Sequence, residues 1–146
     1  MSGIFGTNAF FITDLNLIIQ IIAFIFVLIG FRYKVRRKFR NHGFAMGTAV
    51  FLHFFSFLIA MGPSFFKGFK FFITDVSLTG VQTMWVHAVT GVIALILGIA
   101  IVVAWIARAS DITVCTRRKR LMDVTILFWF TSLIFGIATY LFFYLG

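Results

Sequence analysis

The residues of this sequence that could carry chemistry are three histidines set in or beside long apolar runs. His53 and His87 lie within such runs, and His42 lies at the entrance of one. An ionisable side chain inside a membrane is costly, so each of them is a candidate functional residue. Pumps and transporters usually need a chain of charged groups, and the middle of each run lacks Asp, Glu, Lys and Arg. The pattern therefore favours a cofactor-binding or packing role over ion transport.

His53 and His87 are placed so that they could hold haem b between the second and third helices. One imidazole on each side of the ring is a usual way for a helical bundle to bind haem iron. At 1.5 Å per residue their depths differ by roughly 9 Å, a gap that tilt or an earlier start of the third helix would reduce. Small residues that would make room for a macrocycle share a face with each histidine: Ala49, Ser56 and Ala60 with His53, and Thr90, Gly91, Ala94 and Gly98 with His87.

The same small residues have a second interpretation. They would equally let the helices pack directly against each other. Either histidine would then be hydrogen-bonded between helices and would bind no cofactor. The sequence leaves both interpretations open.

His42 and Met46 form a candidate metal site at the start of the second apolar run. Residues four apart lie on the same face of a helix, so both side chains could reach one ligand. Copper accepts imidazole and thioether ligands. Two ligands are few for a metal, however, and a histidine beside a basic loop can reach the headgroup region without one.

The sequence contains no catalytic signature. Ser56 has a histidine close by but lacks the orienting acid that nucleophilic catalysis normally uses. A glycine-rich phosphate loop is also absent. Asp123 follows a run of four bases, and we expect it to act as a structural cap in the first turn of the last helix. We therefore expect no enzyme, with electron transfer open only under the haem hypothesis.

Four apolar runs must position these residues, and each is long enough to cross a bilayer as a helix. Of all residues, 62% are hydrophobic and only 12% are charged, about half the charged share of a soluble domain. We therefore expect an all-α fold, a four-transmembrane-helix bundle with short loops that forms one domain over residues 1–146. The expected spans are Leu15–Phe31, Gly43–Gly62, Thr83–Ala107 and Leu121–Tyr144, with Pro63 ending the second.

The charges predict how this bundle is oriented. Six bases lie between the first and second runs and five between the third and fourth, together eleven of the 13. The positive-inside rule assigns these loops to the cytoplasm of a cell membrane and both termini to the outside. The bases form short clusters and no basic helix face, so anionic lipid is a better expected partner than nucleic acid.

The loop between the second and third runs has an unusual composition. Ser64–Ile73 mixes phenylalanines with Lys67 and Lys70 and is too short to span a membrane. We expect it to lie in the membrane interface, with its rings in the lipid boundary and its lysines at the headgroups. A re-entrant loop, or one covered by a partner, is the alternative.

Three segments carry a resemblance to known proteins. They are the basic run Arg36–His42 leading to Met46, the segment Trp85–Ala88 around His87, and Thr116–Arg120 with the aromatic span that contains Trp129 and ends at Tyr144. Over roughly residues 32–144 the chain resembles a family of small four-helix membrane proteins of unknown function. Some members of that family are linked to assembly of haem–copper terminal oxidases. The resemblance implies a respiratory or redox membrane context and fixes no cofactor.

The chain departs from that family at several positions. The family typically has a histidine before the last basic cluster, where this chain has Thr116, and another at the outer end of the second helix, where it has Pro63 and Ser64. His53 is an addition. Only His42 and His87 carry over residue by residue, so a role that needs the full set of histidines would not carry over intact.

These observations lead to three functional hypotheses. The first is a non-catalytic accessory or assembly subunit of a larger membrane-bound redox complex of the respiratory chain, with other integral membrane subunits as partners. The second is a small b-type cytochrome that transfers electrons through haem on His53 and His87. The third is a purely structural subunit of an unrelated membrane enzyme complex.

Overall fold

The computed structural model of the chain describes residues 4, 6, 9–108 and 117–145. Within these residues the fold is helical, and no strand occurs in the described ranges. The elements are α1 (Phe11–Val35), α2 (Phe39–Ser56), the π-helical segment η1 (Phe57–Met61), α3 (Gly62–Thr74), α4 (Thr79–Ile106) and α6 (Lys119–Tyr144).

The expected all-α bundle of four membrane-length helices is confirmed. Four helices are long and apolar enough to cross a membrane: Phe11–Val35, Phe39–Thr74, Thr79–Ile106 and Lys119–Tyr144. Each begins earlier than the apolar run that predicted it, because polar and charged residues at the run ends continue the helix. The chain is therefore built as a multi-pass membrane protein.

The prediction that Pro63 ends the second span is wrong. The helix passes from α2 through η1 into α3 and is 36 residues long. In η1 the Gly62 N–H bonds to the Phe57 carbonyl, five residues back, which is one residue wider than an α-turn. Pro63 then occupies the first turn of α3, where a missing N–H and a fixed φ are tolerated.

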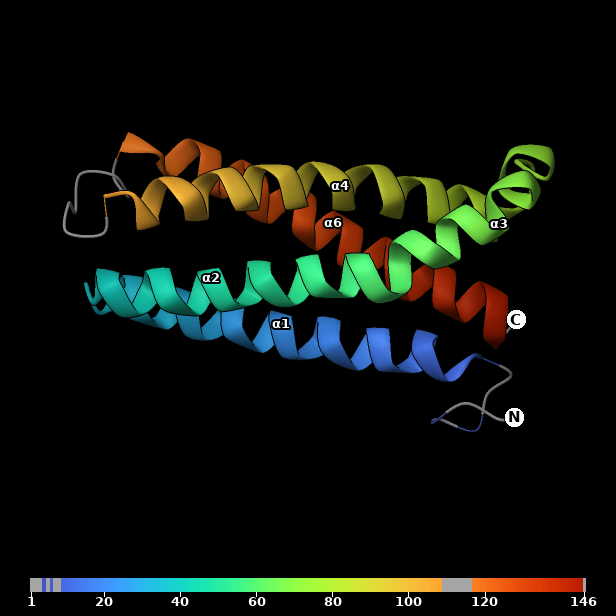
Figure 1. Cartoon of the computed structure of the whole chain (residues 1–146), viewed down its shortest axis with the longest axis horizontal. Coiled ribbons are helices and arrows are strands. Elements are labelled where there is room, and N and C mark those ends of the chain that lie inside the picture. The colour runs from blue at the N-terminus through green and yellow to red at the C-terminus, as the bar shows by residue number, and fades with distance from the viewer. Residues whose placement is uncertain (1–3, 5, 7–8, 109–116, 146) are drawn as a thin grey trace.

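The helices form two antiparallel hairpins that lie side by side (Figure 1). One hairpin is α1 with α2, and the other is α4 with α6; α2 and α4 make the main contact between them. α3 bends away from the line of α2 and crosses the end of the second hairpin. There the Trp85 indole N–H donates to the Phe72 carbonyl at 3.2 Å, and the Phe65 ring packs edge-on against Trp85.

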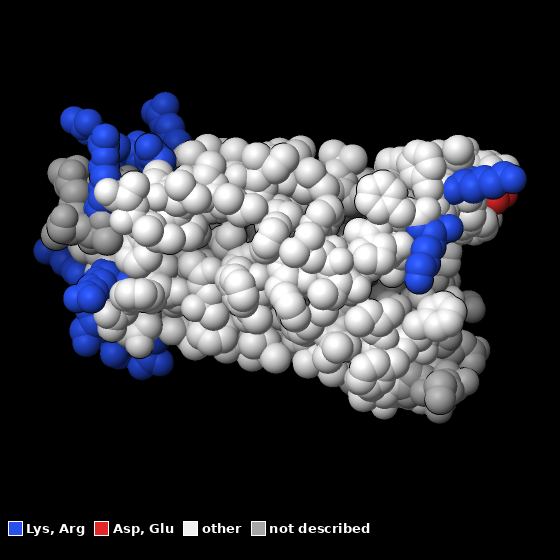
Figure 2. All heavy atoms as spheres, viewed as in Figure 1, with Lys and Arg blue, Asp and Glu red and all other residues white. Residues whose placement is uncertain are grey.

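The charged residues gather at the two ends of the molecule. Figure 2 shows most Lys and Arg side chains at the end formed by the α1–α2 turn and the start of α6. We call this the basic end. The opposite end, called the α3 end, carries Lys67 and Lys70 on α3 together with the beginning of α1 and the end of α6.

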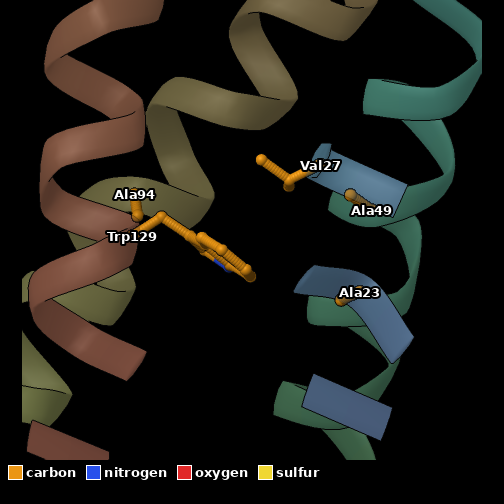
Figure 3. Packing of buried hydrophobic residues seen from close by; sticks show 5 residues of the cluster. All are labelled: Ala23, Val27, Ala49, Ala94 and Trp129. Atoms are coloured by element: carbon orange, nitrogen blue, oxygen red, sulfur yellow. The ribbon is translucent and has the colours of Figure 1, made fainter. Parts of the chain in front are cut away.

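The apolar core lies between the hairpins on the basic side of the middle. Trp129 of α6 reaches across toward Ala23 and Val27 of α1 and Ala49 of α2, while Ala94 of α4 lies beside it (Figure 3). The Trp129 ring stacks on Phe24 at 6.0 Å between centroids. The Trp129 ring thus packs among small side chains of the other three helices and the rings of Phe24 and Phe130.

The expectation that Asp123 caps the last helix is also wrong. α6 begins at Lys119, its N-cap is Arg118 without a side-chain cap hydrogen bond, and its first turn holds no acidic residue. Asp123 lies beyond that turn and is exposed. The helix starts earlier than the apolar pattern indicates, because Lys119 and Arg120 are themselves helical.

Candidate functional site

A buried hydrogen-bonded cluster joins the two helices of the first hairpin near the middle of the bundle. The Gln20 amide N–H of α1 donates to Ser56 Oγ of α2 at 2.9 Å. The Ser56 hydroxyl in turn donates to the Asn16 side-chain carbonyl. His53 Nδ1 lies 3.0 Å from Gln20 Oε1. We call Asn16, Gln20, His53 and Ser56 the His53 cluster.

His53 also faces the second hairpin. Its side chain is only 5% exposed, and its Nε2 lies 3.5 Å from the Gly91 carbonyl oxygen of α4. A Cβ at Gly91 would lie 2.8 Å from the Ser132 hydroxyl oxygen of α6, so this glycine lets α4 and α6 pack closely at the same level. His53 is therefore at the level of Gly91 and contacts α1 and α4, and it lines a cavity whose wall includes residues of α6.

His87 belongs to a different contact, between α4 and α6. Its Nδ1 lies 2.8 Å from the Ser132 carbonyl oxygen and 3.1 Å from the Ser132 hydroxyl. That hydroxyl donates to the His87 backbone carbonyl at 3.1 Å. A Cβ at Gly136 would lie 2.8 Å from Nδ1, so the ring fills the space next to this glycine. The arrangement is that of a histidine used to pack two helices.

The predicted haem pair can be tested against this geometry. Because α4 begins at Thr79, His53 lies level with Gly91, four residues or about 6 Å from His87 along the helix, closer than the sequence indicated. A macrocycle would still need a flat slot beside each ring. The Nε2 side of His53 instead faces the α4 backbone, and His87 is fitted against Gly136. As the helices are packed here, His53 and His87 do not fit a shared haem.

His42 and Met46, the predicted metal ligands, converge on one residue of α1. His42 Nδ1 lies 2.9 Å from the Gly30 carbonyl oxygen. A Cβ at Gly30 would lie 2.7 Å from the Met46 sulfur. Their side chains thus lie close together at the basic end, and Met122 of α6 lines the same cavity. Among the described residues no group of three or more His, Cys, Asp or Glu gathers, so copper at His42 and Met46 stays a prediction.

Two cavities lie between the hairpins on the basic side of His53. The cavity next to His53 leaves about 40 Å³ for the centres of water-sized spheres. The other leaves about 60 Å³ and reaches His42 and Lys34 at the basic end. Met46, Val50, Thr125 and Ile126 line both cavities. By this measure one water needs about 10–15 Å³, so each cavity has room for a few waters and for no macrocycle.

Sequence reasoning missed most of the polar partners. Asn16 and Gln20 were only interruptions of the first apolar run, although their i, i+4 spacing places both on one helix face. Asp14 is fully buried in the first turn of α1 and accepts a hydrogen bond from the Tyr140 hydroxyl at 2.7 Å. Polar side chains on one face of a span are a signal in themselves, because lipid cannot satisfy them.

No protein-family model matches the chain, and neither a curated protein nor a solved structure shows significant similarity to it. The family resemblance of the basic and histidine segments is therefore still a prediction. Thr116, one of the positions where the chain departs from that family, lies outside the described residues.

Proposed function

We propose that this chain is a non-catalytic accessory or assembly subunit of a larger membrane-bound redox complex. The observation that carries the proposal is that the polar residues inside the bundle are used in contacts with one another. The His53 ring nitrogens contact α1 and α4, and the His87 ring contacts α6. Both histidines thus behave as packing residues between helices. The redox context rests on the resemblance of the segments around His42 and His87.

The outward surface of the first hairpin supports a partner within the membrane. Phe51 and Phe55 of α2 and Leu58 of η1 follow one another at spacings of four and three residues and are 44–63% exposed. The rings of Phe51 and Phe55 stack with centroids 6.4 Å apart. Helices associate in lipid through close packing, and a preformed aromatic ridge offers a partner helix a fixed shape. The inward-facing glycines of α4 serve contacts within the chain instead.

The experiment is co-purification from native membranes in mild detergent. Alanine at Phe51, Phe55 and Leu58 together is expected to release co-purifying integral subunits. The matched control replaces Val89, Ile96 and Val103 with alanine, since these form an equally exposed but aliphatic face of α4. A wild-type chain that purifies alone as a monomer, or equal loss of partners in both variants, would contradict the proposal.

The proposed orientation places the basic loops in the cytoplasm and both termini outside. Its support is the bias of Lys and Arg to one end of the bundle (Figure 2). Cys115, the single cysteine, follows the third span in the sequence, so an impermeant maleimide should label it only after cells are opened. In a Cys115→Ser chain carrying Ser77→Cys at the turn before α4, intact cells should be labelled. Labelling of Cys115 in intact cells would mean that the orientation is the opposite of the proposed one.

A further inference from the structure

The cavity at the basic end is bounded by apolar side chains from all four membrane-length helices. They include Phe31 of α1, Val50 of α2, Trp105 of α4, and Met122 and Ile126 of α6, and nearly all of the wall surface is apolar. Apolar cavities of this kind stay dry and accept apolar ligands. Atoms that line an empty space lose dispersion contacts, which a hydrocarbon group would restore. Hydrocarbon therefore suits this cavity better than water does.

The helices around this cavity pack closely on one side more than on the other. Between the hairpins, α2 and α4 come so near that a Cβ at Gly43 would overlap the Trp105 ring. The closely packed helix pairs are α1 with α2, α2 with α4 and α4 with α6, and α1 with α6 is not among them. Trp129 of α6 stacks on Phe24 of α1 near the middle of the bundle. Since the cavity is not fully enclosed, the loosely packed α1–α6 side at the basic end is where a lipid chain can reach it.

A positive charge lies beside this apolar cavity. Lys34, in the last turn of α1, is the charged residue among the described residues that line it. The His42 imidazole in the same wall is already bonded to the Gly30 carbonyl. Residues 31–43 hold six bases and no acidic residue, so the positive charge has no counterpart within that segment. Basic pockets between membrane helices bind the headgroups of anionic lipids.

We propose that this cavity holds part of one acyl chain of an anionic phospholipid, with the phosphate of that lipid beside Lys34. The space of about 60 Å³ for the centres of water-sized spheres admits a few methylene groups, each of about the size of a water molecule. It therefore takes a section of a single chain, and the rest of the lipid stays in the surrounding bilayer. This inference goes beyond the role of an accessory subunit and does not depend on it.

The bound chain would contact both hairpins, because the wall residue Phe31 belongs to the first and Met122 to the second. It would thus continue at the basic end the packing that Trp129 provides nearer the middle. The two parts of the site select differently. The apolar wall accepts the acyl chain of any phospholipid, whereas Lys34 favours a lipid with a net negative headgroup. We therefore expect the preference of the site to lie in the headgroup.

The test uses the full chain in phosphatidylcholine vesicles with a small fraction of phosphatidylglycerol that carries a photoreactive diazirine on one acyl chain. After irradiation, mass spectrometry of peptides is expected to find label at Met46 and Met122 in the cavity wall, and at Leu127, which is 65% exposed on α6. A phosphatidylcholine with the same diazirine should label Leu127 equally and the two methionines much less. Methionine labelling that is absent, or equal for the two probes, would overturn the proposal.

A pair of lysine variants tests the place of the headgroup. Lys34→Gln should raise the fraction of phosphatidylglycerol needed for half-maximal methionine labelling by about fivefold, the effect of one base near an anionic lipid. Lys38→Gln is the matched control, because Lys38 is exposed before the start of α2, makes no side-chain cap hydrogen bond and does not line the cavity. An equal shift in the two variants would mean that general attraction to the basic end, without a site, explains the labelling. Neither result bears on whether the chain co-purifies with partner subunits.

Discussion

The two halves of the bundle differ in how their helices are joined. On the α3 side of the middle, polar side chains meet in pairs and clusters: Gln20 with Ser56 and His53, and Asp14 with Tyr140. On the basic side, Trp129 packs among alanines of the other helices and the rings of Phe24 and Phe130, and two cavities remain. Hydrogen bonds between side chains join the helices of the first half, whereas apolar packing dominates in the second, where His42 adds one bond to the Gly30 carbonyl.

The difference shows how a small bundle can combine a fixed and an adaptable part. Hydrogen bonds in lipid specify partners and angles, although each contributes only about 0.6 kcal/mol on average. Packing of one large ring against small residues specifies distance but leaves gaps where shapes do not match. Both cavities lie in that second half, and the larger-volume one extends to His42 and Lys34 at the basic end.

The largest loss in free energy of unfolding is expected from Trp129→Ala, which removes the central ring of the apolar core in the basic half. Truncation of a buried tryptophan to alanine in the core of a soluble protein lowers the free energy of unfolding by about 3–5 kcal/mol. We expect about 2–3 kcal/mol here, since lipid replaces water as the reference for the exposed ring and only the lost packing counts. Unfolding in mixed micelles of rising SDS fraction measures it. Trp129→Phe should lose clearly less; an equal loss would mean that ring size does not matter.

The polar half can be probed with a double-mutant cycle between Gln20 and His53. Each single change to leucine strands a buried partner and should cost about 1–2 kcal/mol in the same unfolding assay. The double variant should cost less than the sum of the two, because neither partner is then left alone. Strict additivity would mean that the 3.0 Å contact contributes no coupling.

Two glycines one turn apart on α2 test how closely the helices pack in the basic half. A Cβ at Gly43 would lie 2.3 Å from the Trp105 ring, whereas one at Gly47 would meet only Val102 at 4.0 Å. Gly43→Ala should therefore destabilise by about 1 kcal/mol, through crowding that outweighs the gain in helix propensity. Gly47→Ala should be neutral or stabilise by up to about 1 kcal/mol. A larger loss of stability in Gly47→Ala than in Gly43→Ala, in the same unfolding assay, would refute this account.

The smallest effect is expected from Tyr140→Phe at the α3 end. The change removes one hydrogen bond to Asp14 and keeps the ring, so the expected loss is about 0.6 kcal/mol. Tyr144→Phe, one turn further along α6, serves as the reference for removal of a hydroxyl near the helix end. A loss above about 2 kcal/mol would indicate that the pair is coupled to more of the bundle.

Much of the architecture could be predicted from the sequence, because the cost of leaving backbone groups unpaired in lipid turns every long apolar run into a helix. The placement of His53 and His87 on different helices followed from the same argument. Their partners did not follow, since the face of α1 that meets α2 depends on how the two helices pack in three dimensions. Gln20 shows the difficulty: its neighbours in space lie 33 and 36 residues away along the chain.

Pro63 and Asp123 show a second limit of sequence patterns. A proline inside a helical pattern usually ends or kinks the helix, yet one wider turn before Pro63 lets this helix continue. An acidic residue after a basic run resembles a cap, yet here the basic run is itself helical. In both cases a local rule failed because the adjoining turn had a geometry that composition does not reveal.

The wide turn in η1 has a consequence for where α3 points. One extra residue in a helical turn rotates everything beyond it by about 100° relative to an uninterrupted α-helix. Phe65 and Phe72, seven residues apart on one face of α3, both meet other rings on the second hairpin. Deleting one residue from η1 should swing that face aside and leave Trp85 without its cover. A single inserted amino acid is thus enough to give one long helix two separately aimed surfaces.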